Sequence, residues 1–280
     1  MKPLPRSPLR ASNRVLLAPF VAAAGALAWG WFEAGWVRLR ELTCPVPGLP
    51  EELAGLRIAH LSDFHLGVPS RGARAVERAV DWAAARRPEL VCLTGDLLTR
   101  PAGLPRLREL TERIPGAYVV LGNHDVGYAK DPFARRAAPF DPGPVRLLQD
   151  DAVTVEARGR RIQVAGVDPW SQIQGTARPA GLADPGADLR ILLCHFPKVV
   201  DALPEGAFQL VLAGHFHDGQ IALPYGVGKL RLGDPRAPYP HGLFSRPGLT
   251  LHVSAGLGTS LVPFRFFARP EATELVLQPA

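Results

Sequence analysis

The feature that most constrains this chain is a series of short apolar segments that end in Asp, His or Asn. The first three segments of strand length are Arg57–Leu61, Leu90–Thr94 and Ala117–Leu121, and stretches with helical spacing separate them. This alternation predicts βαβ units, in which right-handed crossovers join parallel strands. Because the carboxyl ends of parallel strands meet at one rim of a sheet, polar residues at those ends should gather there.

The second half of the chain adds further strands to this pattern. Two more near-continuous apolar runs, Leu189–Cys194 and Gln209–Ala213, resemble the buried strands of the first half. Val153–Ala157 and Ile162–Val167 flank a short polar stretch, which predicts a hairpin. Further strands are predicted at Leu249–Ser254 and Thr273–Leu277, and helices at Ala73–Arg87, Leu104–Arg113 and Pro197–Leu203. The sequence therefore predicts one α/β domain in which helices cover a pair of sheets.

Nine polar residues stand just after five of the apolar runs: Asp63, His65, Asp96, Asn123, His124, Asp125, His195, His215 and His217. Each residue alone could be a turn residue, a helix cap or a structural histidine. Together they mix carboxylate oxygens with imidazole nitrogens and lack Cys, which favours a catalytic site for Zn, Fe or Mn. Asp63 and His65 are two residues apart, so in an extended chain they point to the same side, as do His215 and His217.

The order of these motifs resembles the calcineurin-like metallophosphoesterase family over roughly Leu56 to Leu277. The motifs are Asp63-x-His65, Gly95-Asp96, Gly122-Asn123-His124-Asp125, His195 and Gly214-His215-x-His217. A membrane-anchored bacterial branch of YaeI-like and YkuE-like phosphoesterases is the nearer resemblance. It is carried by the basic-apolar N-terminus, Gly219-Gln220-Ile221, Gly256-Leu257-Gly258-Thr259-Ser260 and Pro263–Phe267. The resemblance implies an α/β fold, a four-layer α/β/β/α sandwich, with a dinuclear metal centre at the rim of a sheet.

The resemblance also implies a role for each residue. One transition-metal ion (Mn, Fe or Zn) would be held by Asp63, His65 and His217. The second ion would be held by Asn123, His195 and His215, and Asp96 would bridge the two. A water or hydroxide between the ions would be the nucleophile. His124 would stabilise charge on the phosphoryl group or protonate the leaving oxygen, with Asp125 orienting its ring.

On this resemblance the chain is expected to be a metal-dependent phosphoester hydrolase acting on a phosphodiester or pyrophosphate near a membrane. A UDP-2,3-diacylglucosamine-type pyrophosphate is the narrower alternative, and a non-catalytic binding module on the same fold is the alternative of another class. The complete ligand set favours the enzyme. Phe216 and Asp218 depart from the Gly-His-Thr-His-Gly-Gly stretch common in the family, and Asp218 adds negative charge beside the site. No nucleic-acid partner is expected, since the net charge of +6 includes no block of Lys and Arg.

The N-terminus predicts an interaction with a membrane. Lys2, Arg6, Arg10 and Arg14 precede the 18 uncharged residues Val15–Phe32. This pattern predicts an uncleaved signal anchor with a cytoplasmic N-terminus and an extracytoplasmic catalytic body. Two alternatives stay open: a cleaved signal peptide with its site at Ala26-Leu27-Ala28, and a hydrophobic hairpin lying on the cytoplasmic face.

The predicted organisation has three parts. Residues 1–42 form the basic N-terminus and anchor, residues 43–52 a Pro-rich linker, and residues 53–280 the catalytic domain. Within that domain, Leu261–Phe267 is expected either to be core strand and loop or to form a membrane-facing lip. In such a lip, Arg265 would pair with lipid phosphate.

Overall fold

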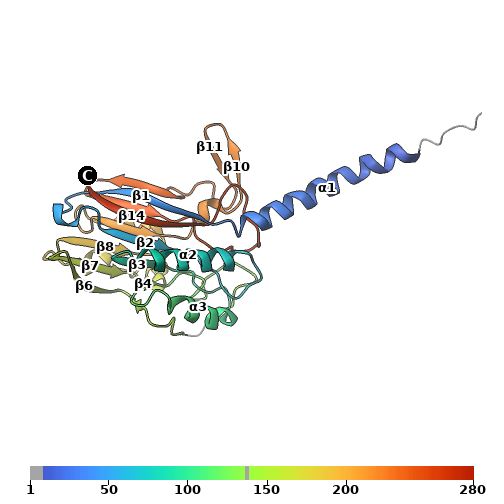
Figure 1. Cartoon of the computed structure of the whole chain (residues 1–280). Helices are drawn as coiled ribbons and strands as arrows, with labels where there is room; N and C mark the ends of the chain where they lie inside the picture. Colours follow the sequence, from blue (N-terminus) through green and yellow to red (C-terminus); the bar gives the residue numbers. More distant parts are fainter. Residues whose placement is uncertain (1–8, 136–138) are drawn as a thin grey trace, which may run out of the picture.

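Two six-stranded sheets packed face to face form the body of the protein (Figure 1). The computed structural model describes residues 9–135 and 139–280. The first sheet has the order β1 (Arg38–Val46), β14 (Glu271–Pro279), β2 (Arg57–Leu61), β3 (Leu90–Thr94), β4 (Tyr118–Val120) and β5 (Arg146–Leu147). β2 to β5 are parallel, as the βαβ pattern predicted, whereas β14 runs antiparallel to β2.

The second sheet is parallel in its centre and antiparallel at both edges. Its order is β12 (Gly242–Arg246), β13 (Leu249–Val253), β9 (Leu210–Ala213), β8 (Leu189–Leu193), β7 (Arg160–Gly166) and β6 (Asp151–Ala157). The predicted hairpin is confirmed as the antiparallel pair β6 and β7. A separate two-stranded hairpin, β10 (Ala222–Tyr225) and β11 (Gly228–Arg231), projects beyond both sheets (Figure 1).

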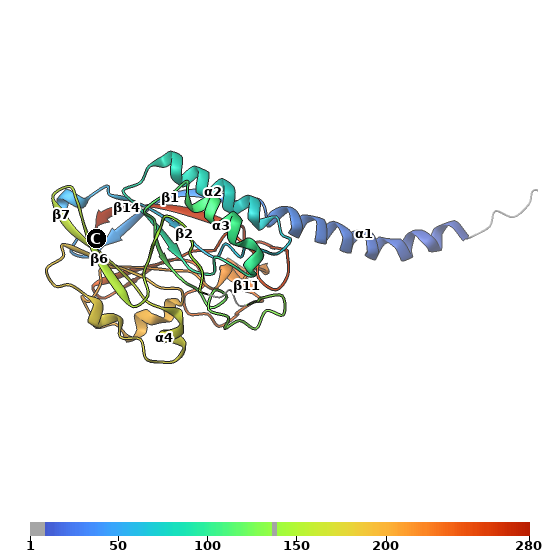
Figure 2. The same ribbon diagram turned by 90° about the horizontal axis from the view of Figure 1, so that it is seen from below.

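Long helices cover only one outer face of the paired sheets. The α-helices are α1 (Leu9–Glu33), α2 (Gly72–Arg86), α3 (Leu104–Thr111) and α4 (Pro169–Ile173). Figure 2 shows α2 and α3 on one side of the body and α4 on the other. Short 3-10 helices lie at Glu51–Leu53, Pro101–Gly103, Pro179–Leu182, Pro197–Ala202 and His217–Gly219. The predicted α/β character is confirmed, but the outer layer beside the second sheet has only α4 and 3-10 turns instead of long helices.

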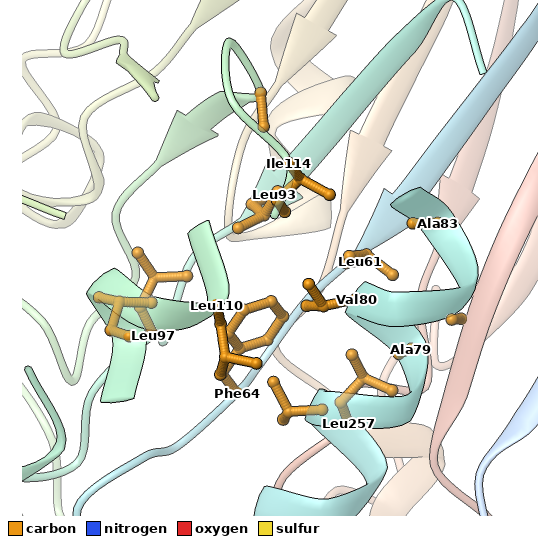
Figure 3. Close-up of a cluster of buried hydrophobic side chains, with 14 of the residues drawn as sticks. Leu61, Phe64, Ala79, Val80, Ala83, Leu93, Leu97, Leu110, Ile114 and Leu257 are labelled. Carbon is orange, nitrogen blue, oxygen red and sulfur yellow. The ribbon is translucent and has the colours of Figure 1, made fainter. Parts of the chain in front are cut away.

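The apolar runs are continuous because the strands are buried on both faces. In β2, Ile58 packs between the two sheets, while Ala59 and Leu61 pack toward α2. Figure 3 shows this outer core, where Val80 of α2 lies near Leu61 and Phe64. Each such fully buried side chain contributes about 1.5–3 kcal/mol from its removal from water. These contacts fix the carboxyl ends of β2 and β3 at one rim of the first sheet.

The folded body begins earlier than the sequence predicted. Thr43–Val46, expected as the start of a linker, are instead the end of β1, which pairs along its length with β14. Pro45 is tolerated because β1 is an edge strand, where a missing N–H need not break a ladder. Cys44 and Leu53 are buried in the core between the sheets. Residues 43–52 are therefore part of the folded domain, and the prediction that they form a linker is wrong.

The N-terminal apolar segment is helical, because α1 contains all of Val15–Phe32. Among residues 9–135 and 139–280, no helix meets the length and hydrophobicity needed to cross a membrane. That Val15–Phe32 spans a membrane therefore stays a prediction.

Candidate metal centre

The structure brings the predicted site residues together at the carboxyl ends of the strands. Three overlapping groups each place their ligand atoms within 4.8 Å of one another: Asp63, His65 and His217; His65, Asp96 and His124; and Asp96, His195 and His215. The loops after β2, β3, β4, β8 and β9 supply them. Residues from 63 to 217 thus meet in one cluster of oxygen and nitrogen donors.

Asp96 occupies the middle of this cluster. Its Oδ2 lies 3.6 Å from His65 Nε2 and 3.3 Å from His195 Nε2. Its Oδ1 accepts the backbone N–H of His124 at 2.8 Å. Burial acts to raise the pKa of Asp96, but the His195 and His124 rings outweigh it and hold that pKa well below its ordinary value. One carboxylate oxygen is therefore fixed by the backbone, and the other faces both halves of the cluster.

Asp63, His65 and His217 form one half. His217 Nε2 lies 3.3 Å from Asp63 Oδ1 and 3.0 Å from His65 Nε2. His65 Nδ1 is 3.0 Å from Thr99 Oγ1, and His217 Nδ1 is 3.1 Å from a guanidinium nitrogen of Arg265. Each ring is therefore fixed through the nitrogen that faces away from the cluster. Their Nε2 atoms consequently converge on the Asp63 side of the cluster.

Asn123, His195 and His215 form the other half. His195 Nε2 lies 3.1 Å from Asn123 Oδ1 and 3.2 Å from His215 Nδ1. His195 Nδ1 lies 2.8 Å from the carbonyl oxygen of Thr94 and donates to it, so in the neutral ring Nε2 is the acceptor that faces the cluster. Burial acts to lower the pKa of His195, but Asp96 outweighs it and raises that pKa to about 9.

This donor set fits transition-metal ions. Lone pairs of four imidazoles, two carboxylates and an amide point into the same small volume, where a cation would satisfy them together. The rings carry partners on their outer nitrogens, as metal-ligating histidines usually do.

The backbone at these residues is not extended. Asp63, His65, Asp96, His215 and His217 all have positive φ, between 48° and 81°. The prediction that Asp63 and His65 share a side because of strand alternation is therefore wrong in its reason, although their side chains do converge. Such conformations cost of order 1–3 kcal/mol each and are typical of functional sites.

Two glycines in the motifs allow loops to approach closely. A Cβ at Gly122 would lie 2.1 Å from Asp96 Oδ1, and a Cβ at Gly214 would lie 2.1 Å from Ser62 Oγ. Any side chain at Gly122 would displace the Asp96 carboxylate. The Gly-Asn-His-Asp and Gly-His motifs thus need glycine for steric reasons.

The predicted contact between Asp125 and the His124 ring is wrong. The Asp125 carboxylate accepts three backbone N–H groups instead, from Leu97 (3.1 Å), Leu98 (2.8 Å) and Gly122 (2.8 Å). Among the described residues His124 Nδ1 has no hydrogen-bond partner, and His124 Nε2 lies 4.0 Å from Asp96 Oδ2 and 3.5 Å from Ser260 Oγ. Asp125 therefore ties the loop after β3 to the loop after β4.

A cleft of about 620 Å³ opens over the cluster. Asn123, His215 and His217 form its floor, and Phe216, Leu261 and Val262 are among its apolar walls. Of the two alternatives for Leu261–Phe267, the lip in which Arg265 pairs with lipid phosphate is wrong for this residue, since its side chain is fully buried. Its guanidinium donates to carbonyl oxygens of Gly258, Ala255 and Ala268 at 2.7–2.9 Å. It cannot also bind a lipid phosphate.

Sequence reasoning missed a histidine pair beneath the centre. His60 of β2 and His252 of β13 face each other between the sheets, with their Nδ1 atoms 2.7 Å apart. His60 Nε2 lies 2.9 Å from Thr94 Oγ1, so the pair adjoins the residue that holds His195. Burial lowers the pKa of His60 to about 3, which keeps its ring neutral. Both histidines lie inside apolar strands, where no motif marks them.

Comparison with known proteins identifies the class. The calcineurin-like phosphoesterase family model matches residues 56–219, and the chain belongs to that family. It is a hydrolase of phosphoric ester bonds from a metal-dependent family, and its clustered His and Asp residues could bind metal.

Three relatives illustrate the range of the family. Phosphodiesterase YaeI of Escherichia coli is 25% identical, over 95% of this chain and 98% of that protein. UDP-2,3-diacylglucosamine pyrophosphatase LpxG of Chlamydia muridarum is 25% identical, over 90% of this chain and 93% of that protein. A transmembrane protein with a metallophosphoesterase domain from Bos taurus is 30% identical, over 84% of this chain and 56% of that protein.

Proposed function

We propose that this protein hydrolyses a phosphodiester or pyrophosphate bond with two transition-metal ions, Mn, Fe or Zn. The observation that carries the proposal is the position of Asp96 Oδ2, within 3.6 Å of ring nitrogens from both halves of the cluster. On this proposal Asp96 bridges the ions. The remaining ligands are Asp63, His65 and His217 for one ion and Asn123, His195 and His215 for the other.

The chain's own groups would act around that centre. When bound, the ions would polarise the phosphoryl oxygens and make a nucleophilic water available near neutral pH. His124 is 6% exposed and borders the cluster without a partner on Nδ1 among the described residues. It would stabilise phosphoryl charge or protonate the leaving oxygen. Asp125 would hold the loop of Asp96 and the loop of Asn123 in a fixed relative position through its three hydrogen bonds with backbone N–H groups.

The substrate would lie at a membrane. Leu261 and Val262 give the cleft an apolar wall, and relatives named as a transmembrane protein and as a UDP-2,3-diacylglucosamine pyrophosphatase support a lipid-linked substrate. A UDP-diacylglucosamine-type pyrophosphate is the sharpest form of this proposal. Residues 15–32 would anchor the chain with the catalytic body outside the cytoplasm, and attachment to the cytoplasmic face is the alternative.

The central test combines metal removal with Asp96→Asn. The chelated protein should lose hydrolysis of a soluble aryl phosphodiester and regain it with Mn²⁺, and elemental analysis should find two ions per chain. Asp96→Asn should lose most activity and metal, because a neutral amide bridges two cations poorly. Asp168→Asn is the matched control, since Asp168 is not in the ligand cluster: its carboxylate caps α4 and accepts a hydrogen bond from Gln149 Nε2. Full activity of Asp96→Asn would exclude the bridging role. A protein that binds metal but hydrolyses no phosphoester would instead be a non-catalytic binding module on this fold.

A further inference from the structure

Large apolar side chains are exposed at one side of the cleft and along the groove between α1 and the β10–β11 hairpin. They come from the end of α1, from the β10–β11 hairpin and from the loop before β14. We call them the apolar collar: Trp29, Trp31, Phe32, Trp36, Leu223, Tyr225, Val227, Leu230, Leu261, Val262 and Phe267. Val227 at the hairpin turn is fully exposed, and Tyr225 is 77% exposed. A large patch of exposed apolar side chains on a protein surface usually marks an interaction site.

The three segments form one rigid surface because Phe266 joins them. Its backbone pairs with the base of the hairpin, through Ala222 N–H to Phe266 O at 2.9 Å and Phe266 N–H to Gln220 O at 3.0 Å. Its ring packs against Gly30 of α1, where an added Cβ would lie 2.4 Å away. Figure 1 shows the hairpin at the end of the body from which α1 leaves.

The end of α1 is also fixed to the body by polar contacts. The buried Glu33 carboxylate accepts the backbone N–H of Ala268 at 2.9 Å, and Gly30 O accepts that of Arg265 at 3.0 Å. Helix, hairpin and cleft therefore keep a constant relative orientation. Whatever surface the end of α1 lies on, the cleft opens beside it.

Cationic side chains accompany the aromatic rings. Arg269 stacks on Trp36 with its guanidinium carbon 3.7 Å from the ring centroid, and Arg71 lies 5.8 Å from that of Phe32. A groove of about 400 Å³ separates α1 from the hairpin, and its lining includes Trp29, Lys229 and Arg269. Aromatic rings beside Arg and Lys suit the interface of a bilayer with anionic headgroups.

We propose that the apolar collar docks on an anionic phospholipid bilayer, with the hairpin turn inserted, so that the cleft opens at headgroup level. This inference builds on the proposed function, because a docked collar would let a lipid-linked phosphoester reach the metal centre without leaving the membrane. Leu261 and Val262 line the cleft and also belong to the collar, so one surface would hold both the bilayer and the substrate.

The test places an environment-sensitive fluorophore on the hairpin turn of the full chain in nanodiscs. Val227→Cys carries the label, and Trp170→Cys on α4, across the body from α2 and α3, is the matched control (Figure 2). Cys44, Cys92 and Cys194 are buried, and burial raises their thiol pKa values, to about 12 for Cys44, so they should label slowly.

With phosphatidylglycerol in the disc, the label at position 227 should show blue-shifted emission, loss of iodide quenching and quenching by nitroxide lipids. The label at position 170 should show none of these changes. Equal iodide quenching at both positions would overturn the proposal. Protection of position 227 from both quenchers would indicate a protein contact and would overturn it too. Hydrolysis of a soluble aryl phosphodiester by both labelled chains separates failure of docking from failure of the proposed function.

Discussion

Asp218, which departs from the common family motif, is predicted to hold the β10–β11 hairpin to the metal centre. It follows His217 directly, is 2% exposed, and its carboxylate meets Lys229 Nζ at 2.5 Å and Arg231 Nε at 2.8 Å. An isolated two-stranded hairpin is marginally stable in water. Beyond the backbone contacts at its base near Ile221, these two ion pairs link the hairpin to the site. We therefore expect Asp218→Asn to loosen the hairpin.

The exposure of the two cations sets the size of this effect. Breaking a fully buried ion pair costs about 3–5 kcal/mol. The side chains of Lys229 and Arg231 are 35% and 26% exposed, so water can solvate them once the carboxylate is gone. Discounting for that screening leaves about 1–2 kcal/mol for hairpin docking, or roughly a 5- to 30-fold larger undocked population.

Hydrogen exchange measures this population directly. Amides of β10 and β11 in Asp218→Asn should exchange roughly 5- to 30-fold faster than in wild type, while those of β8 stay unchanged. Lys229→Met is the matched control, because Asp218 then keeps Arg231, and its effect should be smaller. Unchanged exchange in the hairpin of Asp218→Asn would refute the reasoning, as would equal acceleration throughout the chain, which would show general destabilisation.

Two further substitutions separate chemistry from structure. His124→Ala should lower kcat by about two to four orders of magnitude while metal content stays at wild-type level, and metal loss would instead make His124 a ligand. Asp125→Ala should lower the free energy of unfolding by about 2–4 kcal/mol, because three buried N–H groups lose their acceptor. Urea denaturation measures this loss of stability, with Asp168→Ala as the control. A lowered kcat at unchanged stability would instead support the prediction that Asp125 orients the His124 ring.

The sequence predicted the strands and the cluster because both follow from local patterns. Short continuous apolar runs such as Leu90–Thr94, rich in β-branched residues or bounded by polar ones, are typical of strands buried on both faces, and the structure places β3 there with the same bounds. Asp96 then had to stand at the rim, whatever the rest of the fold. Elements without a strong local pattern were missed. β1 contains Pro45 and three charged residues, Arg38, Arg40 and Glu41, and it forms a strand because β14 offers it a partner.

Side-chain partners were harder to predict than positions. The family resemblance implied that Asp125 orients the His124 ring, but backbone N–H groups from another loop compete successfully for its carboxylate. Arg265 stands among aromatic residues, and the sequence left open whether it lies in the core or in an exposed lip. In the fold, six contacts with loop carbonyl groups and a His ring stabilise its buried guanidinium, and no local pattern shows those contacts. Contacts with residues distant in the sequence therefore determine where such side chains lie.

The pH dependence of metal binding follows from the protonation of His195. In the metal-free protein burial acts against the charged ring, but Asp96 outweighs it and raises the pKa of His195 to about 9. Burial instead lowers the pKa of His215 to about 3 and that of His65 well below its ordinary value, so these rings are already neutral at pH 7. On the proposed ligand set, His195 must lose a proton before it can bind a metal ion.

Metal affinity should therefore rise with pH up to about 9. The metal-free form with protonated His195 is favoured below that pH, so a proton competes with the ion, and affinity should change about tenfold per pH unit between pH 7 and 9. Titration calorimetry in two buffers of different ionisation enthalpy should find close to one proton released per chain at pH 7.5 from this ring and almost none at pH 10. Affinity that stays level across this range, or falls as pH rises, would show that Asp96 does not hold His195 in its charged form.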